Sequence, residues 1–211
     1  MKTFIVGSST LTLTFICQYL AKNQCESNIH KCHIIVDKNN ILKRWKSWNK
    51  SHETKDVIVQ HNDNQSFDFD EKNLIIFDQV SDSKLLENIS KFSNIIVATT
   101  SPTTIMDIDN IKTFHNVFIS KTRDVVRRSQ YHTLFVNSKN CDFKLFKKKL
   151  NELRRNDYLS ISLQDKDTKI EQVIFPVEKN KVKNVENKKN KILNVCDTNK
   201  DLKGFKEIIK D

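Results

Sequence analysis

The chain has 211 residues, of which 37% are hydrophobic and 29% are charged, enough apolar side chains for one packed domain with an appendage. No apolar run approaches the roughly 20 residues of a membrane helix, and the opening MKTFIVG is too short for a signal peptide. These features argue against a membrane or secreted protein and predict an intracellular one. The net charge is +10, but residues 1–120 sum to zero, so the excess positive charge belongs to the second half of the chain.

In the first part of the chain, short apolar runs alternate with segments of helical spacing. Strands are predicted at residues 3–6, 32–36, 57–59, 74–77, 94–98 and 117–119, and helices over 13–20, 41–48 and 85–89. The small polar residues 7–12 are predicted to form a loop. This alternation indicates an α/β fold with a mostly parallel central sheet flanked by helices. Ligands bind such sheets at the carboxyl ends of strands, where Gly7, Asp78 and Thr99 are expected.

The second part of the chain is predicted to add two helices, a hairpin and a tail. The helices cover 123–132 and 143–153, and the second has an apolar stripe opposite a basic side. Residues 158–163 and 170–175 are predicted to pair as a C-terminal hairpin. Residues 179–211 hold ten Lys and six Asn, so we expect a flexible basic tail whose last ten residues have the spacing of a short helix. The predicted domains are therefore 1–178 and the tail 179–211.

A degenerate phosphate-binding loop is predicted between the first strand and the first helix. A P-loop reads G-x-x-x-x-G-K-[ST] in this context. Its eight positions, the candidate cofactor-binding residues, are Gly7, Ser8, Ser9, Thr10, Leu11, Thr12, Leu13 and Thr14. The first glycine and the last threonine match the motif, but Thr12 replaces the second glycine and Leu13 replaces the lysine. In an intact loop the lysine neutralises phosphate charge and the glycine lets backbone N–H groups wrap the anion, so both functions are missing.

Two later strand ends complete the predicted site. NLIIFDQV, residues 73–80, has the form of a Walker B strand, whose aspartate holds Mg²⁺ together with the P-loop hydroxyl. The predicted metal ligands are therefore Thr14 and Asp78. The next position, Gln79, stands where active enzymes carry a second carboxylate, and an amide cannot accept a proton. Thr99 has the place of a γ-phosphate sensor, so Asp78, Gln79 and Thr99 are the catalytic candidates. The plain alternatives are a capped buried strand and a polar loop.

Residues 121–155 form a basic segment with eleven Lys/Arg against three Asp/Glu. Such a segment attracts a phosphate backbone with salt-sensitive and sequence-blind affinity. The alternative is a solvated helix face. The candidates for DNA contact, or for an arginine acting across subunits, are Arg123, Arg127, Arg128, Lys147, Lys148, Arg154 and Arg155.

With these elements in order, the chain resembles the FtsK/HerA-type genome-packaging ATPases of DNA viruses, a poxvirus and Polinton-like group. MKTFIVGSSTLTLTF is similar to their first strand and P-loop, NLIIFDQV to their Walker B strand, NIIVATTSP to their sensor strand, and NVFISKTRDVVRRSQYHTLF to their basic helix. The resemblance implies a RecA-like P-loop NTPase fold, a ring oligomer and ATP-driven DNA translocation. It also implies an arginine acting in trans, here Arg123, Arg127 or Arg128, and a place in the host cytoplasm or nucleus or in the virion.

The leading hypothesis is a DNA-packaging ATPase-like subunit that is weakened or inactive in ATP hydrolysis, because Leu13 and Gln79 remove two of the groups that stabilise phosphoryl transfer. ATP and Mg²⁺ are its cofactors if nucleotide binding survives. DNA, a homo- or hetero-oligomeric ring and an active ATPase paralogue are the expected partners, with no membrane. The alternatives are a superfamily 2 helicase-like domain, which CHIIVDKNNILKRWKSW resembles, and a clamp-loader-like scaffold without catalysis.

Overall fold

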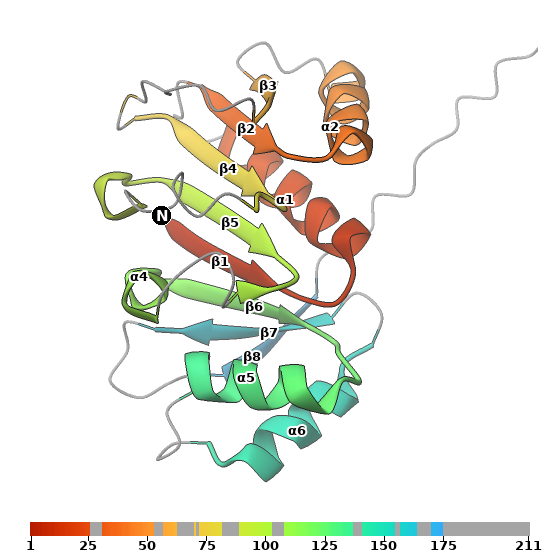
Figure 1. The fold of residues 1–211 in the computed structure, drawn as a ribbon, viewed down its shortest axis with the longest axis vertical. Helices are drawn as coiled ribbons and strands as arrows, with labels where there is room; N and C mark the ends of the chain where they lie inside the picture. The colour runs from red at the N-terminus through yellow and green to blue at the C-terminus, as the bar shows by residue number, and fades with distance from the viewer. Residues whose placement is uncertain are drawn as a thin grey trace, which may run out of the picture. The chain divides into compact units, whose positions relative to one another are not determined.

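The computed structural model describes residues 1–25, 31–52, 57–62, 70, 72–81, 89–102, 108–136, 141–154, 157–163 and 170–174 (Figure 1). These stretches belong to one compact unit, Met1–Val177. Three predictions lie outside the described residues: the helix over 85–89 except for its last residue, the tail 179–211 with its short terminal helix, and any role of Arg155.

The strands within the described residues form a single eight-stranded sheet in the order β3-β2-β4-β5-β1-β6-β7-β8. Neighbours among β1 to β6 run parallel, whereas β7 is antiparallel to both β6 and β8. The strands are β1 (Lys2–Val6), β2 (Cys32–Val36), β3 (Val57–His61), β4 (Leu74–Asp78), β5 (Ile95–Thr99), β6 (Asn116–Ser120), β7 (Asp157–Ser162) and β8 (Ile170–Ile174).

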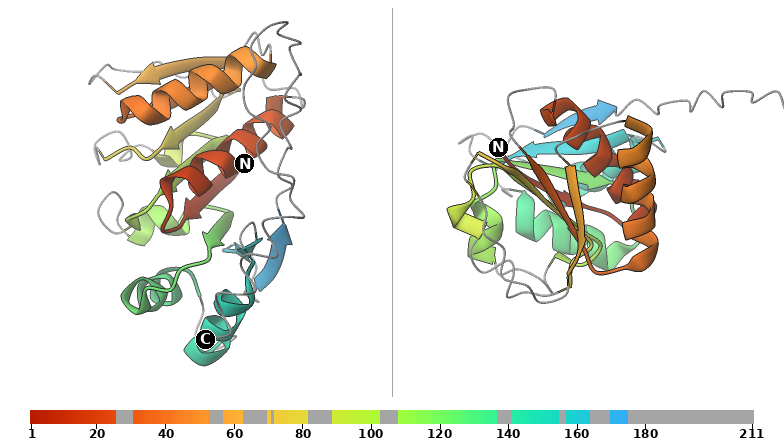
Figure 2. Two further views of the ribbon diagram at one scale, coloured as in Figure 1. Left: turned by 90° about the vertical axis from the view of Figure 1, so that its right-hand side faces the viewer. Right: turned by 90° about the horizontal axis from the view of Figure 1, so that it is seen from above.

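Helices cover both faces of this sheet (Figure 2). They are α1 (Thr10–Cys25), α2 (Asn39–His52), α4 (Ile108–Lys112), α5 (Val125–Phe135), α6 (Phe143–Glu152) and the short 3-10 helix η2 (Ile89–Lys91). Side chains of α1 and α2 pack on one face, and those of α4, α5 and α6 pack on the other. Within the described part of the chain, no helix combines the length and the apolar character needed to cross a membrane.

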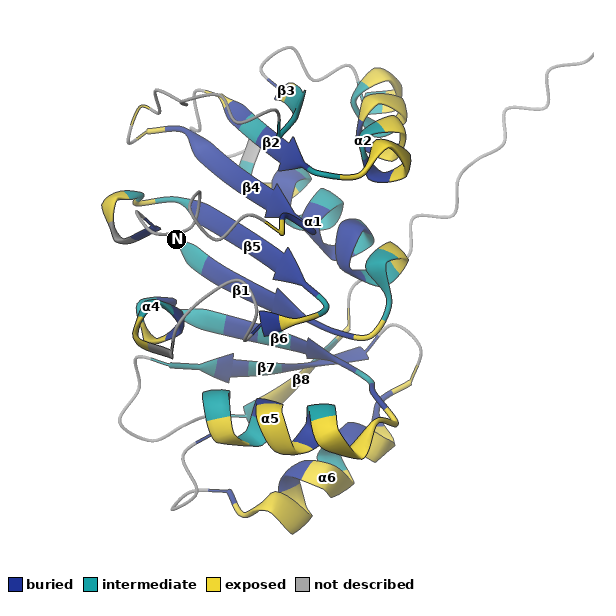
Figure 3. Ribbon diagram, viewed as in Figure 1, coloured by how far each residue is buried: buried dark blue, intermediate teal, exposed yellow. Residues whose placement is uncertain are grey.

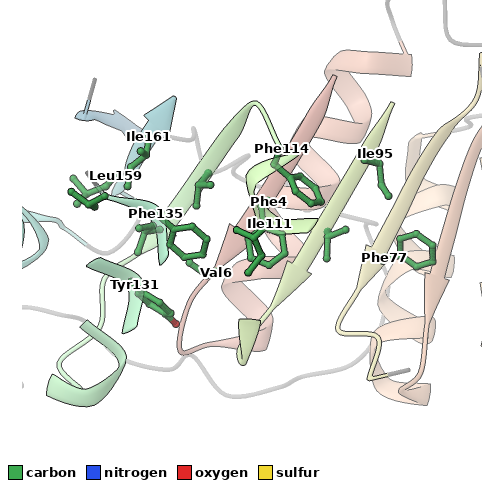
Figure 4. Close-up of a cluster of buried hydrophobic side chains, with 14 of the residues drawn as sticks. Phe4, Val6, Phe77, Ile95, Ile111, Phe114, Tyr131, Phe135, Leu159 and Ile161 are labelled. Atoms are coloured by element: carbon green, nitrogen blue, oxygen red, sulfur yellow. The ribbon is translucent and has the colours of Figure 1, made fainter. Parts of the chain in front are cut away.

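Two hydrophobic clusters lie on opposite faces of the sheet because successive strand side chains point to opposite sides. Ile5 packs toward α1 and α2, whereas Phe4 and Val6 pack toward the other face. There Phe4 contacts Phe114 and Phe135, with ring centroids 5.1 and 5.8 Å apart (Figure 4). The central strands are buried on both faces (Figure 3), so they read in the sequence as continuous apolar runs rather than as alternating ones.

The predicted α/β fold, with its mostly parallel sheet and C-terminal hairpin, is confirmed, since all eight predicted strands are present within a residue or two of their predicted ends. The helix beginnings differ more. Helix α1 begins at Thr10 rather than at Leu13, and α5 begins at Val125 rather than at Arg123. The cause at α5 is Asp124, whose carboxylate accepts the N–H groups of Val126 and Arg127 and so sets the helix start.

Candidate functional site

The carboxyl edge of the sheet brings three predicted site residues together. Val6, the last residue of β1, pairs with Thr99 of β5, and Ala98 of β5 pairs with Asp78 of β4. Gly7 follows Val6 directly, so Gly7, Thr99 and Asp78 stand on three adjacent strands at one edge. The prediction that Gly7 and Asp78 share one end of the sheet is confirmed.

The connection between β1 and α1 is shorter than the loop predicted over 7–12, because only Gly7 to Ser9 separate the two elements. The carbonyl of Ser9 accepts the N–H of Leu13 at 3.1 Å, and the Ser9 hydroxyl accepts the N–H of Thr12 at 3.4 Å. Ser9 thus acts as the N-cap, a role that serine fills well. The N–H groups of Thr12 and Leu13 are therefore used within the first turn of α1.

Leu13, at the position of the Walker lysine, is fully buried in the cluster beneath α1 and α2. Gly7 is required for close packing. A Cβ on Gly7 would lie 2.0 Å from the Oγ of Ser120, at the end of β6, and 3.2 Å from a methyl group of Leu13. The loop is therefore packed tightly between β6 and α1, and it presents no cation from the lysine position.

Asp78 is the centre of a buried polar cluster. It is fully buried, and its Oδ2 accepts a hydrogen bond from the indole Nε1 of Trp45 at 2.9 Å. Burial raises the pKa of Asp78 to about 6, against the opposing effect of the neighbouring Thr14 hydroxyl, Trp45 indole and Gln79 amide. Thr14 and Asp78, the two predicted metal ligands, thus lie side by side.

The donor set of this cluster fits a small hard cation. Thr14 is buried in the first turns of α1, and neither its Oγ1 nor the Oδ1 of Asp78 makes a hydrogen bond to any described residue. Mg²⁺ prefers hydroxyl, carboxylate and water oxygens. Trp45 uses only Oδ2, so Oδ1 is left for a ligand. Among the described residues, no group of three or more His, Cys, Asp and Glu is placed to hold a metal ion, so the remaining ligands would be water or phosphate.

The other two catalytic candidates lie beside this cluster. Gln79 is buried with a φ of 62°, a left-handed conformation that costs free energy in a residue other than glycine. Its N–H donates to the carbonyl of Ala98 at 2.9 Å, and its Nε2 has no partner among the described residues. The hydroxyl of Thr99 accepts the N–H of Ser101 at 3.0 Å, which fixes it in a turn at the edge of the sheet.

The basic segment, residues 121–155, is not one uniform charged surface. Arg128 is buried, and its Nε donates to the carbonyl of Thr122 at 2.7 Å, so this guanidinium is occupied within the fold. Arg127 lies 3.5 Å from the carboxylate of Asp124. Lys148 forms a long contact with Glu152 at 4.0 Å. The exposed candidates without an ion pair to a described residue are Arg123, Lys147 and Arg154.

Two residues of the site carry no sequence signal of their role. Trp45 fits one face of a predicted helix, and nothing in its spacing indicates a hydrogen bond to Asp78, 33 residues away. Ser120 is the last residue of β6 and belongs to no motif, yet its side chain leaves no room for a Cβ at position 7. The sheet order places β6 next to β1, and that order is not readable from local patterns.

The sheet order and the strand–loop–helix at Gly7 define the class by fold: this is the RecA-like P-loop NTPase fold, with β5 lying between β1 and β4. Within it, solved structures of a viral genome-packaging enzyme are similar to the chain. The genome packaging NTPase B204 from Sulfolobus turreted icosahedral virus 2, in complex with AMPPCP, matches with a TM-score of 0.55 at 14% identity over 82% of this chain and 98% of that one.

The DNA-packaging ATPase B204 from Sulfolobus Turreted Icosahedral Virus matches with a TM-score of 0.56 at 10% identity, over 82% of this chain and 98% of that one. At these identities the likeness establishes the fold. No protein-family model matches the chain, and no curated protein matches it either. The resemblance drawn from the sequence motifs is therefore supported by a three-dimensional comparison that was independent of it.

Proposed function

We propose that the chain is a DNA-handling subunit of the genome-packaging ATPase type whose nucleotide site no longer sustains ATP hydrolysis. The observation that supports the proposal is that the Thr14 hydroxyl lies beside the buried Asp78 carboxyl, while Leu13, in the place of the lysine, is buried in the hydrophobic core. The metal-binding half of the ancestral site is retained and the phosphate-binding half is lost.

The reason for low turnover is electrostatic. Removing a single preorganised donor to the transition state costs about 3 kcal/mol in enzymes that use one. Here the lysine is absent and Gln79 replaces the second carboxylate, so nothing at that position accepts the proton of an attacking water. The N–H groups of Thr12 and Leu13 are also bound to Ser9. These losses together support a subunit that binds Mg·ATP weakly or not at all.

If Mg²⁺ binds, Thr14 and Asp78 would hold it, through Oγ1 and Oδ1. The metal would supply charge neutralisation for the phosphate oxygens of a bound nucleotide. Trp45 would hold the Asp78 carboxyl in place through Oδ2, and Thr99 would stand at the next strand end on the side of β1.

The expected partners are DNA, bound through the exposed cations of the basic segment, and other subunits of a ring, including an active ATPase paralogue. An arginine acting across subunits must be exposed. Arg123 meets this condition fully and Arg127 in part, whereas Arg128 is buried, so Arg123 is the first choice for substitution.

The experiment uses the two tryptophans, Trp45 and Trp48, which both lie on α2. A Trp48→Phe variant leaves Trp45, hydrogen bonded to Asp78, as the only indole. Its fluorescence is titrated with Mg²⁺ alone and with Mg·ATP, and ATP turnover is measured in parallel. We expect a response to Mg²⁺, little further response to millimolar Mg·ATP, and no turnover above background.

Restoring the lost groups gives the matched comparison. Leu13→Lys with Gln79→Glu should gain affinity for Mg·ATP if the old site is intact, provided that circular dichroism shows the variant to be folded. Robust turnover by the unmodified chain would contradict the proposal. A folded double variant without any gain in affinity would count against assigning the loop to nucleotide.

A further inference from the structure

Helix α2 presents a solvent face on which every charge is positive. Its exposed cations are Lys43, Arg44, Lys46 and Lys50, and its other exposed positions are asparagine or serine (Figure 3). The helix contains no acidic residue. The nearest carboxylates in sequence, Asp37 and Glu53, lie outside it, and that of Asp37 accepts hydrogen bonds from Ser81 and Asn62. We call these four cations the α2 basic face.

All four side chains of this face are exposed and unpaired, whereas several cations of the basic segment are occupied within the fold. No ion pair joins Lys43, Arg44, Lys46 or Lys50 to any described residue. In the basic segment, by contrast, Arg128 is buried and Lys121 donates to the main-chain carbonyls of Asn151 and Leu153 at the end of α6. Unpaired, exposed cations are free to neutralise an external anion without first breaking an internal contact.

The geometry of the face suits a linear polyanion. Lys43, Lys46 and Lys50 follow each other at spacings of three and four, which places them along one side of the helix. At 1.5 Å per residue they extend over about 10 Å, which is about three phosphate spacings along one strand of a duplex. Lysine, arginine, serine and asparagine are all residues that bind phosphate oxygens in nucleic-acid complexes.

The inner side of α2 argues against insertion of this helix into a membrane surface. A helix that lies on a bilayer needs a free apolar face. The apolar residues of α2 are Ile41 and Trp45, both buried, with Leu42 and Trp48 packed against them in the core. Only the cationic side is left for a partner, so attraction to the partner is electrostatic alone.

We infer that the α2 basic face is a second binding surface for the phosphate backbone of nucleic acid, separate from the basic segment. This inference rests on the proposed DNA-handling function and adds a surface to it. The two surfaces lie on opposite faces of the sheet, α2 beside β2 and β3 and α5–α6 near β6 to β8 (Figure 1). Trp45 connects this helix to Asp78, so the surface is anchored directly on the candidate metal site.

The test compares three full-length variants that each lose four positive charges. The first changes the α2 basic face, Lys43, Arg44, Lys46 and Lys50, to glutamine. The second changes four cations of the basic segment, Arg123, Lys144, Lys147 and Arg154, to glutamine. The third is the control and changes Lys31, Lys72, Lys91 and Lys112 to glutamine. Each of these lysines precedes a strand, so they lie at the amino edge of the sheet, opposite the carboxyl edge that holds Asp78. Fluorescence anisotropy with a labelled mixed-sequence duplex gives Kd as a function of salt.

We expect the α2 variant to raise Kd at least about tenfold relative to the control variant and to reduce the salt slope by about three, since each phosphate contact contributes about 0.9 to that slope. Equal Kd values for the α2 and control variants would overturn the inference. So would binding of the wild type to anionic phosphatidylserine vesicles without binding to duplex.

The variants separate the proposed DNA contact through residues 121–155 from the inferred contact through the α2 basic face. If only the basic-segment variant loses affinity, the proposed DNA contact through 121–155 stands and the α2 face is rejected. If only the α2 variant loses affinity, the inference stands and the assignment of the basic segment fails. If the wild type does not bind duplex at all, DNA handling and the α2 surface are both rejected, whatever the outcome of the nucleotide titration.

Discussion

The chemistry at the carboxyl edge of the sheet depends on the hydrogen bond from Trp45 to Asp78. A buried carboxylate without a cation is costly unless donors compensate for lost hydration. The indole donates to Oδ2 at 2.9 Å and, with the neighbouring Thr14 hydroxyl and Gln79 amide, lowers the pKa of Asp78, but burial outweighs these donors and leaves that pKa raised to about 6. Asp78 is therefore a source of instability at neutral pH in the absence of metal.

This has a defined effect on stability against pH. The folded-state pKa of about 6 exceeds the ordinary value of 3.8. The folded protein therefore holds the Asp78 proton more tightly than the unfolded chain does. The stabilisation from that proton is complete below about pH 4 and is lost as the pH rises through about 6, a difference on the order of 3 kcal/mol.

Asp78→Asn removes this titration. In EDTA we expect the variant to have a higher free energy of unfolding than the wild type near pH 7, by about 1 to 3 kcal/mol. The advantage should shrink toward zero as the pH falls to about 4. Urea denaturation at a series of pH values measures both chains, and other carboxylates cancel in the difference. A difference that does not change with pH would show that Asp78 is not the titrating group.

Gly7 offers a second test at the same scale. Gly7→Ala places a methyl group against the Oγ and Cβ of Ser120, at 2.0 and 2.9 Å, and against Leu13. Overpacking of this kind costs about 1 to 3 kcal/mol. We expect that loss in urea denaturation, and a smaller loss when Ser120 is changed to Gly in the same chain. A penalty that is equal in both backgrounds would mean that Ser120 is not the obstacle.

At the scale of single residues the sequence predicts positions better than contacts. The strand pattern predicts that Gly7 and Asp78 lie at one edge of the sheet, and the structure has them there with Thr14 beside Asp78. Helical spacing also places Leu13 on the apolar side of the first helix, where it is buried, but it does not predict that Arg128 is buried against the Thr122 carbonyl. The burial of Arg128 depends on which elements are neighbours, and that is decided by the whole sheet.

At the scale of elements the strands are predictable for a simple reason. A parallel strand covered on both faces must be apolar along its length, so β1, β4 and β5 appear as uninterrupted runs between polar residues. Helix beginnings are less predictable, because they depend on which side chain caps the first turn. Ser9 and Asp124 both take that role, and each moves a helix start by two or three residues from the position that apolar spacing suggests.

Charge sums over long stretches do not reveal α2 as a basic element. Residues 38–50 contain five cations and no acidic residue, but residues 1–120 as a whole sum to zero. The net charge of a long stretch does not reveal a single helix whose charged residues are all positive. The net charge of each predicted helix, counted over the residues outside its apolar side, identifies the α2 basic face from the sequence alone.

At the scale of the whole molecule the positive charge has three locations: the α2 basic face, the basic segment and the tail. The tail 179–211 carries ten Lys and five Asp/Glu, so it contributes a net +5. Contacts divide the chain between Val177 and Glu178. Folding and long-range electrostatic attraction are therefore expected to be separable in this protein, the first depending on residues up to Val177 and the second on all three regions.

Truncation after Val177 tests this separation. We expect the free energy of unfolding to change by less than about 0.5 kcal/mol, since surface changes away from packed contacts have small effects. We also expect the salt slope of duplex binding to fall, because counterion release scales with the number of cations at phosphates. A full-length variant with the ten tail lysines changed to glutamine is the control: it should reproduce the change in slope if charge alone is responsible. Loss of cooperative unfolding in the truncated chain would instead place part of the folded unit beyond Val177.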